Sequence, residues 1–302
     1  MELRQLQYVI KISEELNFSR AAEKLHIAQP SLSQQLSKLE KELGVILFQR
    51  STNSVELTYA GQAFVENARK IIDSVEQLKQ EMDDISQMRK GKLIVGSLPI
   101  TGSHILPKVL PVYKAKYPQV DITLIEDTTD KLIEHTTGGQ TDISLLALPL
   151  GEQMLEYQTL VEEEIRLAVP PAHRFATRAS LQDQCVELSE LRDEPFVVLK
   201  KGQGFRQLTF DLCRSAGFTP NIMFESSNIE TVQSLVAAGM GIAFVPVMVT
   251  RVKTSEFVPV YLPLAKPRPT RTLVIAYRKG RYLSKAADAF IATLLDVVRK
   301  NS

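Results

Sequence analysis

The sequence predicts an α/β protein made of two unlike parts, a helical N-terminal unit that ends in one long helix and a C-terminal unit of alternating strands and helices. Three observations support this. Apolar residues recur at helical spacing over the first 60 residues, a heptad pattern follows to about residue 88, and beyond Gly91 short apolar runs alternate with helical stretches. With 302 residues, the chain is long enough for two or three domains.

The bulk composition is that of a globular protein, with 44% hydrophobic and 24% charged residues and a net charge of +1. No apolar run approaches the roughly 20 residues that cross a bilayer, and the N-terminus lacks the pattern of a signal peptide. We therefore expect a cytoplasmic protein without a membrane partner. Cys185 and Cys213 show no CxxC spacing, which argues against a disulfide scaffold or a zinc site and leaves a redox role of the two thiols open.

Two short helices are predicted first. Apolar residues at helical spacing indicate a helix from Leu3 to Leu16. Ser19 is a suitable N-cap for a second helix, residues 20–25, because its hydroxyl can accept from the free amides of the next turn. Two adjacent alanines in that helix allow another helix to pack closely.

A third helix is predicted to begin at Pro30, where a first helical turn tolerates the missing N–H, and to end at Gly44. Its apolar face consists of Leu32, Leu36, Leu39 and Leu43. Its polar face consists of Ser31, Ser33, Gln34, Gln35, Lys38 and Lys41. Such a face suits a DNA groove, because Gln can pair with adenine, Ser with bases or phosphates, and Lys with the backbone. Taken alone, a solvated face without a partner explains the pattern equally well.

A short hairpin follows the third helix. Leu47 and Phe48 return to the core, residues 49–54 form a polar tip that carries Arg50, and residues 55–57 run back. After three helices, this hairpin is typical of a wing that touches phosphates. Seven Lys or Arg balance seven Asp or Glu in residues 1–65, so the prediction of DNA binding rests on where the charges lie and not on a basic domain.

One long helix is predicted from Thr58 to about Met88, which at ~1.5 Å per residue is roughly 45 Å long. Its apolar positions alternate spacings of four and three, the pattern of a coiled-coil seam. The seam residues are Phe64, Ala68, Ile71, Val75, Leu78, Met82 and Ile85. We expect this seam to form a dimer and so to favour an inverted-repeat site; packing against the chain's own later domain is the alternative.

Two α/β lobes are predicted after Gly91, each with a parallel sheet covered by helices on both faces. The first set comprises strands 93–96, 120–125 and 143–148 and helices 105–117 and 129–135. The second comprises strands 166–169, 196–199, 221–224 and 241–245 and helices 205–216 and 229–238. The proline-rich segment 263–271 is interpreted as a linker that crosses back to strand 273–276 and helix 286–298.

Polar side chains gather where these strands end and helices begin, which is where ligands bind in open sheets. Thr101, Ser103, Thr129 and Gln203 can donate hydrogen bonds into a cleft between the lobes. Residues 200–204 place two lysines and two glycines before a helix and could form an anion cradle, with a solvated turn as the alternative. We expect a small, anionic ligand there, and neither a metal nor a cofactor.

An enzyme is not expected, because the chain has no HExxH, GxSxG or GxGxxG motif. Its four histidines are scattered, and only His104 lies near the predicted cleft. A solute-binding protein of a transporter is a second alternative, but it would need an export signal and would leave the first 90 residues without a role.

Five motifs at matching spacing resemble the LysR-type transcriptional regulators of bacteria. They are residues 18–25, 28–36, 39–40, 47–50 and 57–61. The resemblance covers the whole chain and implies three domains: a winged helix-turn-helix over 1–58, a dimerising linker helix over 59–90, and an effector-binding domain over 91–302 with a periplasmic-binding-protein-like fold. Lobe I of that domain is expected at about 91–162 and 269–302, and lobe II at about 163–268.

The resemblance also implies roles for single residues. Gln29, Ser31, Ser33 and Gln34 would face the major groove, Pro30 would start the recognition helix, and Arg50 would lie on the wing; we add Lys38 as a backbone contact. Ile100, Thr101, Thr129 and Phe205 would line the effector site, to which the cleft argument adds Leu98, Gly102, Ser103 and Gln203. Expected partners are operator DNA, a small effector and further copies of the chain, with antiparallel linker helices and a tetramer; RNA polymerase is a further candidate partner.

Overall fold

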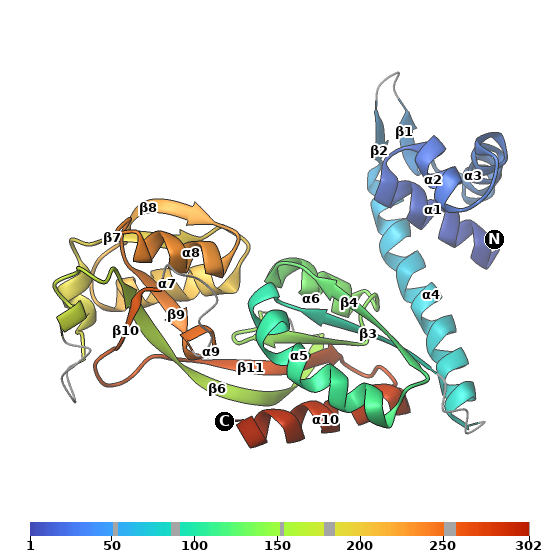
Figure 1. Ribbon diagram of the computed structural model, residues 1–302. Helices are drawn as coiled ribbons and strands as arrows, with labels where there is room; N and C mark the ends of the chain where they lie inside the picture. The colour runs from blue at the N-terminus through green and yellow to red at the C-terminus, as the bar shows by residue number, and fades with distance from the viewer. Residues whose placement is uncertain (51–53, 86–90, 152–153, 178–184, 251–257, 302) are drawn as a thin grey trace. The chain divides into compact units, whose positions relative to one another are not determined.

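The computed structural model describes residues 1–50, 54–85, 91–151, 154–177, 185–250 and 258–301 (Figure 1). The chain forms two compact units. One comprises residues 1–88 with 138–140, and the other comprises residues 89–137 and 141–302. We call the described part of residues 1–85 the head and that of residues 91–301 the C-terminal domain.

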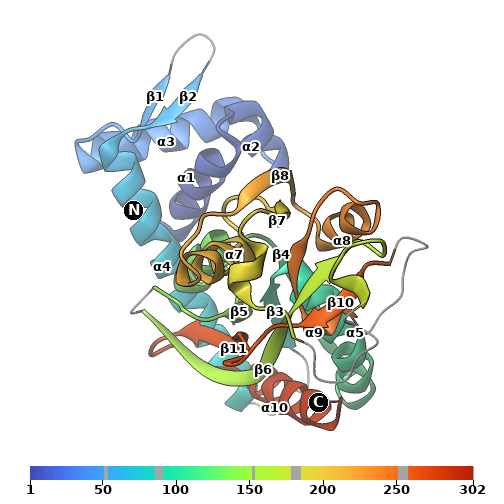
Figure 2. The ribbon, with the colours of Figure 1, turned by 90° about the vertical axis from the view of Figure 1, so that its left-hand side faces the viewer.

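The head contains four helices and one hairpin among its described residues. They are α1 (Leu3–Glu15), α2 (Phe18–Lys24), α3 (Gln29–Leu43), β1 (Phe48–Arg50), β2 (Val55–Leu57) and α4 (Tyr59–Ile85). Apolar side chains from all of the helices and from β1 meet in one core. Its buried members are Val9, Ile12, Phe18, Ala21, Ala22, Leu32, Leu36, Leu39, Leu47, Phe48 and Val65. The predicted arrangement of three helices and a wing is confirmed (Figure 2).

Two details of the head differ from the prediction. The N-cap of α2 is Asn17 and not Ser19, because the Asn17 Oδ1 accepts from the amides of Ser19 at 2.9 Å and Arg20 at 3.0 Å. Leu43 was placed on the apolar face of α3, but it is exposed, since it is the last helical residue before Gly44 turns into the left-handed region at φ 69°.

The start of α4 is fitted closely to the base of the wing. The Thr58 amide donates to the Leu47 carbonyl at 3.0 Å, and its hydroxyl donates to the Ile46 carbonyl at 2.7 Å. A β-carbon added at Gly61 would overlap the same Leu47 carbonyl oxygen. The glycine in the motif at residues 57–61 therefore has a steric cause, because only glycine lets the first turn of α4 approach the Leu47 carbonyl this closely.

The C-terminal domain consists of two lobes joined by two long strands, β6 (Leu155–Val169) and β11 (Thr270–Arg278). Lobe I adds β3 (Gly91–Ser97), α5 (Pro99–Lys116), β4 (Val120–Glu126), α6 (Thr129–Thr137), β5 (Ile143–Ala147) and α10 (Lys285–Asn301). Lobe II adds a 3-10 helix (Leu188–Leu191), β7 (Pro195–Leu199), α7 (Gly204–Ser215), β8 (Asn221–Ser226), α8 (Ile229–Ala237), β9 (Ala243–Pro246), α9 (Val247–Thr250) and β10 (Val260–Pro263). In lobe I, α5 and α10 cover one face of the sheet and α6 covers the other (Figure 1).

The sheet is mixed and not parallel throughout as predicted. Strand β3 is parallel to β4 and β5, and β7 is parallel to β8, whereas β11 runs antiparallel to both β5 and β6. The reason is topological: the chain passes from lobe I to lobe II along β6 and returns along β11, so these neighbours must run in opposite directions. Figure 2 shows β6 curving past α10.

The crossing is made by paired strands and not by a linker loop. Strand β11 already begins at Thr270, which pairs with Glu164, and Pro263 is the last residue of β10. Each lobe has its own core, and the division falls on β6, since Leu160 packs in the lobe I core and Ile165 in the lobe II core. Among the described residues, the crossing strands are therefore the only covalent connection between the two lobes. Any movement of one core relative to the other must bend these strands.

Candidate functional sites

Helix α3 buries one face and presents the other to solvent. Leu32, Leu36 and Leu39 are buried in the head core. The outward face carries exposed Gln29, Pro30, Ser31, Gln34 and Lys38, together with half-buried Ser33. The structure therefore brings the predicted reading residues of this helix together on one accessible surface.

The N-terminal end of that surface is ordered by local contacts. The Gln29 side chain donates to the Ser33 hydroxyl at 3.1 Å, one turn along the helix. Pro30 occupies the first turn, and the N-cap Ala28 provides no side-chain cap, so amides of this turn stay available to an outside acceptor. A helix start of this kind is suited to phosphate.

The wing is an antiparallel pair in which Phe48 lies opposite Leu57 and Arg50 opposite Val55. Glu40 of α3 fixes its base, because the carboxylate accepts from the amides of Leu47 at 2.8 Å and Phe48 at 3.3 Å. The backbone of Arg50 ends β1, while its side chain and residues 51–53 of the tip lie outside the described residues.

The predicted seam on α4 divides into two parts. Phe64 packs against the head core and Ala68 is buried, so neither position presents an exposed apolar side chain. Ile71, Leu78 and Met82 are exposed large apolar side chains, and Leu78 is 57% exposed. Val75 is half-buried, and the side chain of Ile85 lies outside the described residues.

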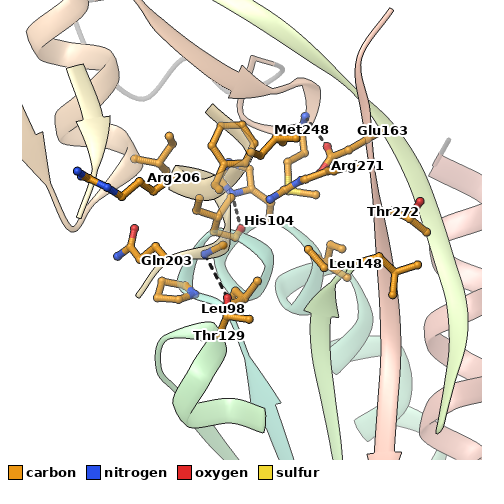
Figure 3. A pocket seen from close by; sticks show the side chains of 18 of the residues that line it. Leu98, His104, Thr129, Leu148, Glu163, Gln203, Arg206, Met248, Arg271 and Thr272 are labelled. Atoms are coloured by element: carbon orange, nitrogen blue, oxygen red, sulfur yellow. Dashed lines mark hydrogen bonds and ion pairs between the residues drawn. The ribbon is translucent and has the colours of Figure 1, made fainter. Parts of the chain in front are cut away.

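A cavity of about 2210 Å³ lies between the two lobes of the C-terminal domain (Figure 3). The first turns of α5, α6, α7 and α8 all contribute to its lining, as do the crossing strands β6 and β11. Six of the eight predicted residues line it: Leu98, Ile100, Ser103, Thr129, Gln203 and Phe205. The expected cleft is thus present, and it is assembled from segments that are far apart in the sequence.

Thr101 and Gly102 do not line the cavity, contrary to the prediction. Helix α5 begins at Pro99 and not near residue 105, which turns both residues inward. Thr101 is fully buried, and its hydroxyl finds no hydrogen-bond partner among the described residues. Gly102 is covered by the side chains of Glu126 and Ser97.

A hydrogen bond joins the lobes at the helix starts. The Gly204 amide at the beginning of α7 donates to the Thr129 hydroxyl at the beginning of α6, at 3.2 Å (Figure 3). The Gln203 side chain donates to the Ser227 carbonyl at 2.9 Å, and it leaves the α7 start without a side-chain cap. Lys201 and Gly202 line the same part of the cavity.

A buried ion pair on the crossing strands was not found from the sequence. Arg271 of β11 lies opposite Glu163 of β6, and its Nε donates to the Glu163 Oε1 at 2.7 Å. The other carboxylate oxygen accepts from the Met248 amide at 3.2 Å. Burial lowers the pKa of Arg271, and the Glu163 carboxylate opposes that shift. The two residues are 108 positions apart, and only strand pairing brings them together.

The three guanidinium groups that line the cavity are each paired with a carboxylate. Arg271 pairs with Glu163, Arg166 with Glu164, and Arg206 with Glu225. The remaining cationic side chains in the lining are those of Lys108 and Lys201, and both are exposed. Free positive charge in the cavity is therefore modest, and the helix starts are its main electropositive feature.

Comparison with known proteins identifies both units. The family described as "Bacterial regulatory helix-turn-helix protein, lysR family" matches residues 3–62, and the "LysR substrate binding domain" matches residues 86–299. The chain belongs to the LysR-type transcriptional regulators. It is 40% identical to the HTH-type regulator YcgK of Bacillus subtilis (strain 168), over 96% of this chain and 93% of that protein.

Two further relatives are OxyR proteins. This LysR-type regulator is 32% identical to the dual regulator OxyR of Escherichia coli (strain K12), over 93% of this chain and 90% of that one. A full-length OxyR variant from Pseudomonas aeruginosa has a TM-score of 0.76 at 29% identity and covers 99% of this chain and 95% of its own. The predicted fold class and a DNA-binding transcriptional regulator in place of an enzyme are confirmed.

As a LysR-type regulator, the protein binds operator DNA through its head, oligomerises, and carries a domain that binds an effector. No helix among the described residues is long and apolar enough to cross a membrane. The described residues also contain no group of three His, Cys, Asp or Glu side chains that could hold a metal ion.

The two thiols have different surroundings. Cys213 on α7 is fully buried, and burial raises the pKa of its thiol to about 12. Cys185 is half-buried. A thiol reacts with peroxide as the thiolate, so the burial of Cys213 and its raised pKa both disfavour this reaction in the folded protein.

Proposed function

We propose that paired heads read an inverted-repeat operator with the outward face of α3 in the major groove. Gln29, Ser31, Ser33 and Gln34 supply base contacts, while Lys38 and the wing residue Arg50 contact phosphates. The observation that supports this assignment is the combination of a buried leucine face and an exposed carboxamide and hydroxyl face on one helix with an uncapped start. RNA polymerase stays a candidate partner of the bound regulator.

We further propose that the exposed seam residues Ile71, Leu78 and Met82 pair two chains. Leaving three large apolar side chains on one stripe in water is unfavourable, and a second α4 can bury them by coiled-coil packing. Because residues 1–65 carry no net charge, one head has little electrostatic affinity for DNA, and two linked heads are needed. Further association of the C-terminal domains into a tetramer is part of this proposal.

We infer that the effector is a small carboxylate that binds in the cavity between the lobes. The observation that carries this inference is the convergence of the first turns of α5, α6, α7 and α8 on one cavity, since each turn offers positive potential and amide donors. The starts of α5 and α7 have no side-chain cap, which leaves donors for a ligand.

The bond between Gly204 and Thr129 connects this ligand to the movement of the lobes. A carboxylate at the α7 start would take the Gly204 amide from the Thr129 hydroxyl and change how the lobes are held. The lobes are joined by β6 and β11, which can act as a hinge. Effector binding would thereby alter the C-terminal domains and, through them, the spacing of the heads.

Peroxide is a second candidate signal, because relatives of this chain are named hydrogen peroxide-inducible genes activators. The environment of Cys213 argues against thiol chemistry at that position, since the thiol is buried and its pKa is raised to about 12. Half-buried Cys185 stays a candidate for oxidation. We therefore favour reversible binding of a small molecule.

The operator proposal is tested by gel shift of the full-length protein on DNA from its own upstream region, with nonspecific competitor. Retarded bands that withstand competitor and weaken with salt are expected. Binding that shows no sequence preference on any genomic fragment would contradict it.

The effector proposal is tested by thermal melting of the full-length protein with a library of small carboxylates, followed by titration of each compound that raises the Tm. Thr129→Val is expected to weaken binding about tenfold, because the Thr129 hydroxyl, once the ligand takes the Gly204 amide from it, would donate to the carboxylate of the ligand. Thr123→Val, on an exposed position of β4 outside the cavity, serves as the matched control. Equal affinities of the two variants would exclude this site.

A further inference from the structure

The Arg271–Glu163 pair is a buried ion pair in the lining of the cavity. Both residues line the cavity, and both side chains are 5% exposed. They are held by two neighbouring strands that cross between the lobes, in direct register. Figure 3 shows the pair next to Met248. The Arg271 side chain is thus a buried, charged group with one side turned to the cavity.

The donors of Arg271 are only partly used. Its Nε and Nη2 both donate to Glu163, and Nη2 also lies 3.7 Å from the Met248 sulfur. Within the described part of the chain, Nη1 has no hydrogen-bond partner, and it is not among the fully enclosed unpaired atoms. The small exposed surface of Arg271 therefore includes Nη1, and it faces the cavity that the residue lines.

The guanidinium is also fixed in position. Its carbon lies 5.2 Å from the ring centroid of Phe205, the second residue of α7, which gives a cation–π contact beside the helix start. Glu163 cannot turn away without cost, because its Oε2 accepts from the Met248 amide. Arg271 therefore presents the N–H donors of its Nη1 to a ligand that reaches from the α7 start.

The charge on this guanidinium is already neutralised. A ligand carboxylate at Nη1 would share Arg271 with Glu163, and two carboxylates in one poorly solvated site repel each other. A carboxamide, ketone or hydroxyl oxygen can accept the same hydrogen bonds without that repulsion. Arg166 and Arg206 do not supply an uncompensated positive charge for a second carboxylate, since each already pairs with a carboxylate.

We propose that Arg271, neutralised by Glu163, is a specificity-determining residue that selects an effector with a neutral hydrogen-bond acceptor at one end and a carboxylate at the other. The carboxylate end lies at the helix starts, so this inference rests on the proposed carboxylate site. The class of ligand is a monoanion with an amide, keto or hydroxyl group, and dicarboxylates of the same length are discriminated against.

The test is calorimetric titration of the full-length protein at constant ionic strength and neutral pH with three matched pairs of compounds. Each pair is a dicarboxylate and its monoamide: succinate and succinamate, glutarate and glutaramate, adipate and adipamate. Wild type is expected to bind the best monoamide about tenfold more tightly than its dicarboxylate. Glu163→Gln leaves the Arg271 charge uncompensated and is expected to reverse that order.

Glu156→Gln is the matched control, because it removes the same charge from an exposed position of β6 that does not line the cavity. It should keep the wild-type order. If Glu163→Gln does not fold, the neutral double variant Glu163→Gln, Arg271→Gln replaces it, and this variant should lose both the order and about tenfold in monoamide affinity.

The outcomes separate the two proposals. A wild type that prefers the dicarboxylates, a Glu163→Gln variant with the wild-type order, or a double variant that keeps this order overturns the role of Arg271. Binding of none of the six compounds to wild type contradicts the carboxylate site itself, and with it this inference.

Discussion

The outward face of α3 and the cavity between the lobes are built in opposite ways. The reading face lies on one helix, and its polar residues from Gln29 to Lys38 are adjacent in the sequence. The cavity takes its lining from four helix starts, two crossing strands and part of α10, and the lining residues extend from Leu98 to Val298 in the sequence. The first surface is fixed by local periodicity, whereas the second exists only after the strands have paired.

The two regions nevertheless share one physical principle. Residues 1–65 carry no net charge, and each guanidinium in the cavity is already paired with a carboxylate. Neither site can therefore rely on bulk charge to attract its ligand. Both depend on placed donors, which are carboxamides and hydroxyls on α3 and helix amides in the cavity.

The largest expected effect concerns Cys213 on α7, the helix whose first turn lines the cavity. A pKa of about 12 in place of 9.0 reduces the thiolate at pH 8 by about a thousandfold, so alkylation by iodoacetamide should be suppressed to that degree in the folded protein. Mass spectrometry after timed labelling measures the rate of alkylation of Cys213, with the urea-unfolded protein as the control. Rapid labelling of Cys213 in the native state would revive a redox role.

The next largest effect is expected for Leu78→Glu on α4. The variant places a charge on the exposed seam and should weaken operator binding by at least about 100-fold, because linkage of two sites contributes roughly 10²–10⁴ in avidity. Sedimentation and gel shift on one preparation measure it. Glu76→Gln, exposed on α4 and off the seam, should bind normally. Full operator binding by Leu78→Glu would show that the heads act without this pairing.

A smaller effect is expected on the stability of the protein when a glycine is replaced in the head or in the cavity. Gly61→Ala should destabilise the protein by about 1–3 kcal/mol, because its β-carbon would overlap the backbone carbonyl of Leu47, which cannot move freely. Gly204→Ala should cost less, since its β-carbon would meet the Thr129 hydroxyl at 3.1 Å and a side chain can give way. Urea unfolding measures the free energy of unfolding of both variants. Equal losses of stability would contradict the proposed difference between backbone packing at Gly61 and side-chain packing at Gly204.

The smallest effect is expected for Lys38→Ala on α3. Loss of one phosphate contact from each of the two paired heads should lower affinity several-fold for all DNA sequences and reduce the salt-dependence slope by about two. Lys92→Ala, exposed on β3, is the control. A change in sequence preference would instead mean that Lys38 touches a base.

Local patterns made most of the head predictable. Leucine spacing, Pro30 and Gly44 defined α3, and the apolar repeat defined α4. The N-cap of α2 was misplaced because Asn17 and Ser19 are both good caps, and only the folded backbone shows which one bonds. For the head, sequence and structure differ by a residue or two.

The cavity was predictable only in outline. Strand ends and helix starts gave Thr129, Gln203 and their neighbours, but the early start of α5 turned Thr101 inward. The Glu163–Arg271 pair depends on the register of two antiparallel strands, and no local pattern announces a contact between residues 108 positions apart. Long-range pairing is the information that a single sequence does not display.

The central claim is that two heads, each reading with α3, recognise a symmetric operator. Selection of binding sites from random DNA by the full-length protein tests it most directly, with Gln34→Ala and, as a matched control, Gln7→Ala on the exposed side of α1. We predict that wild type and Gln7→Ala select the same inverted repeat, while Gln34→Ala loses the preference at one base pair in each half-site and keeps the spacing. Sites without two-fold symmetry, or an unchanged preference in Gln34→Ala, would contradict the account.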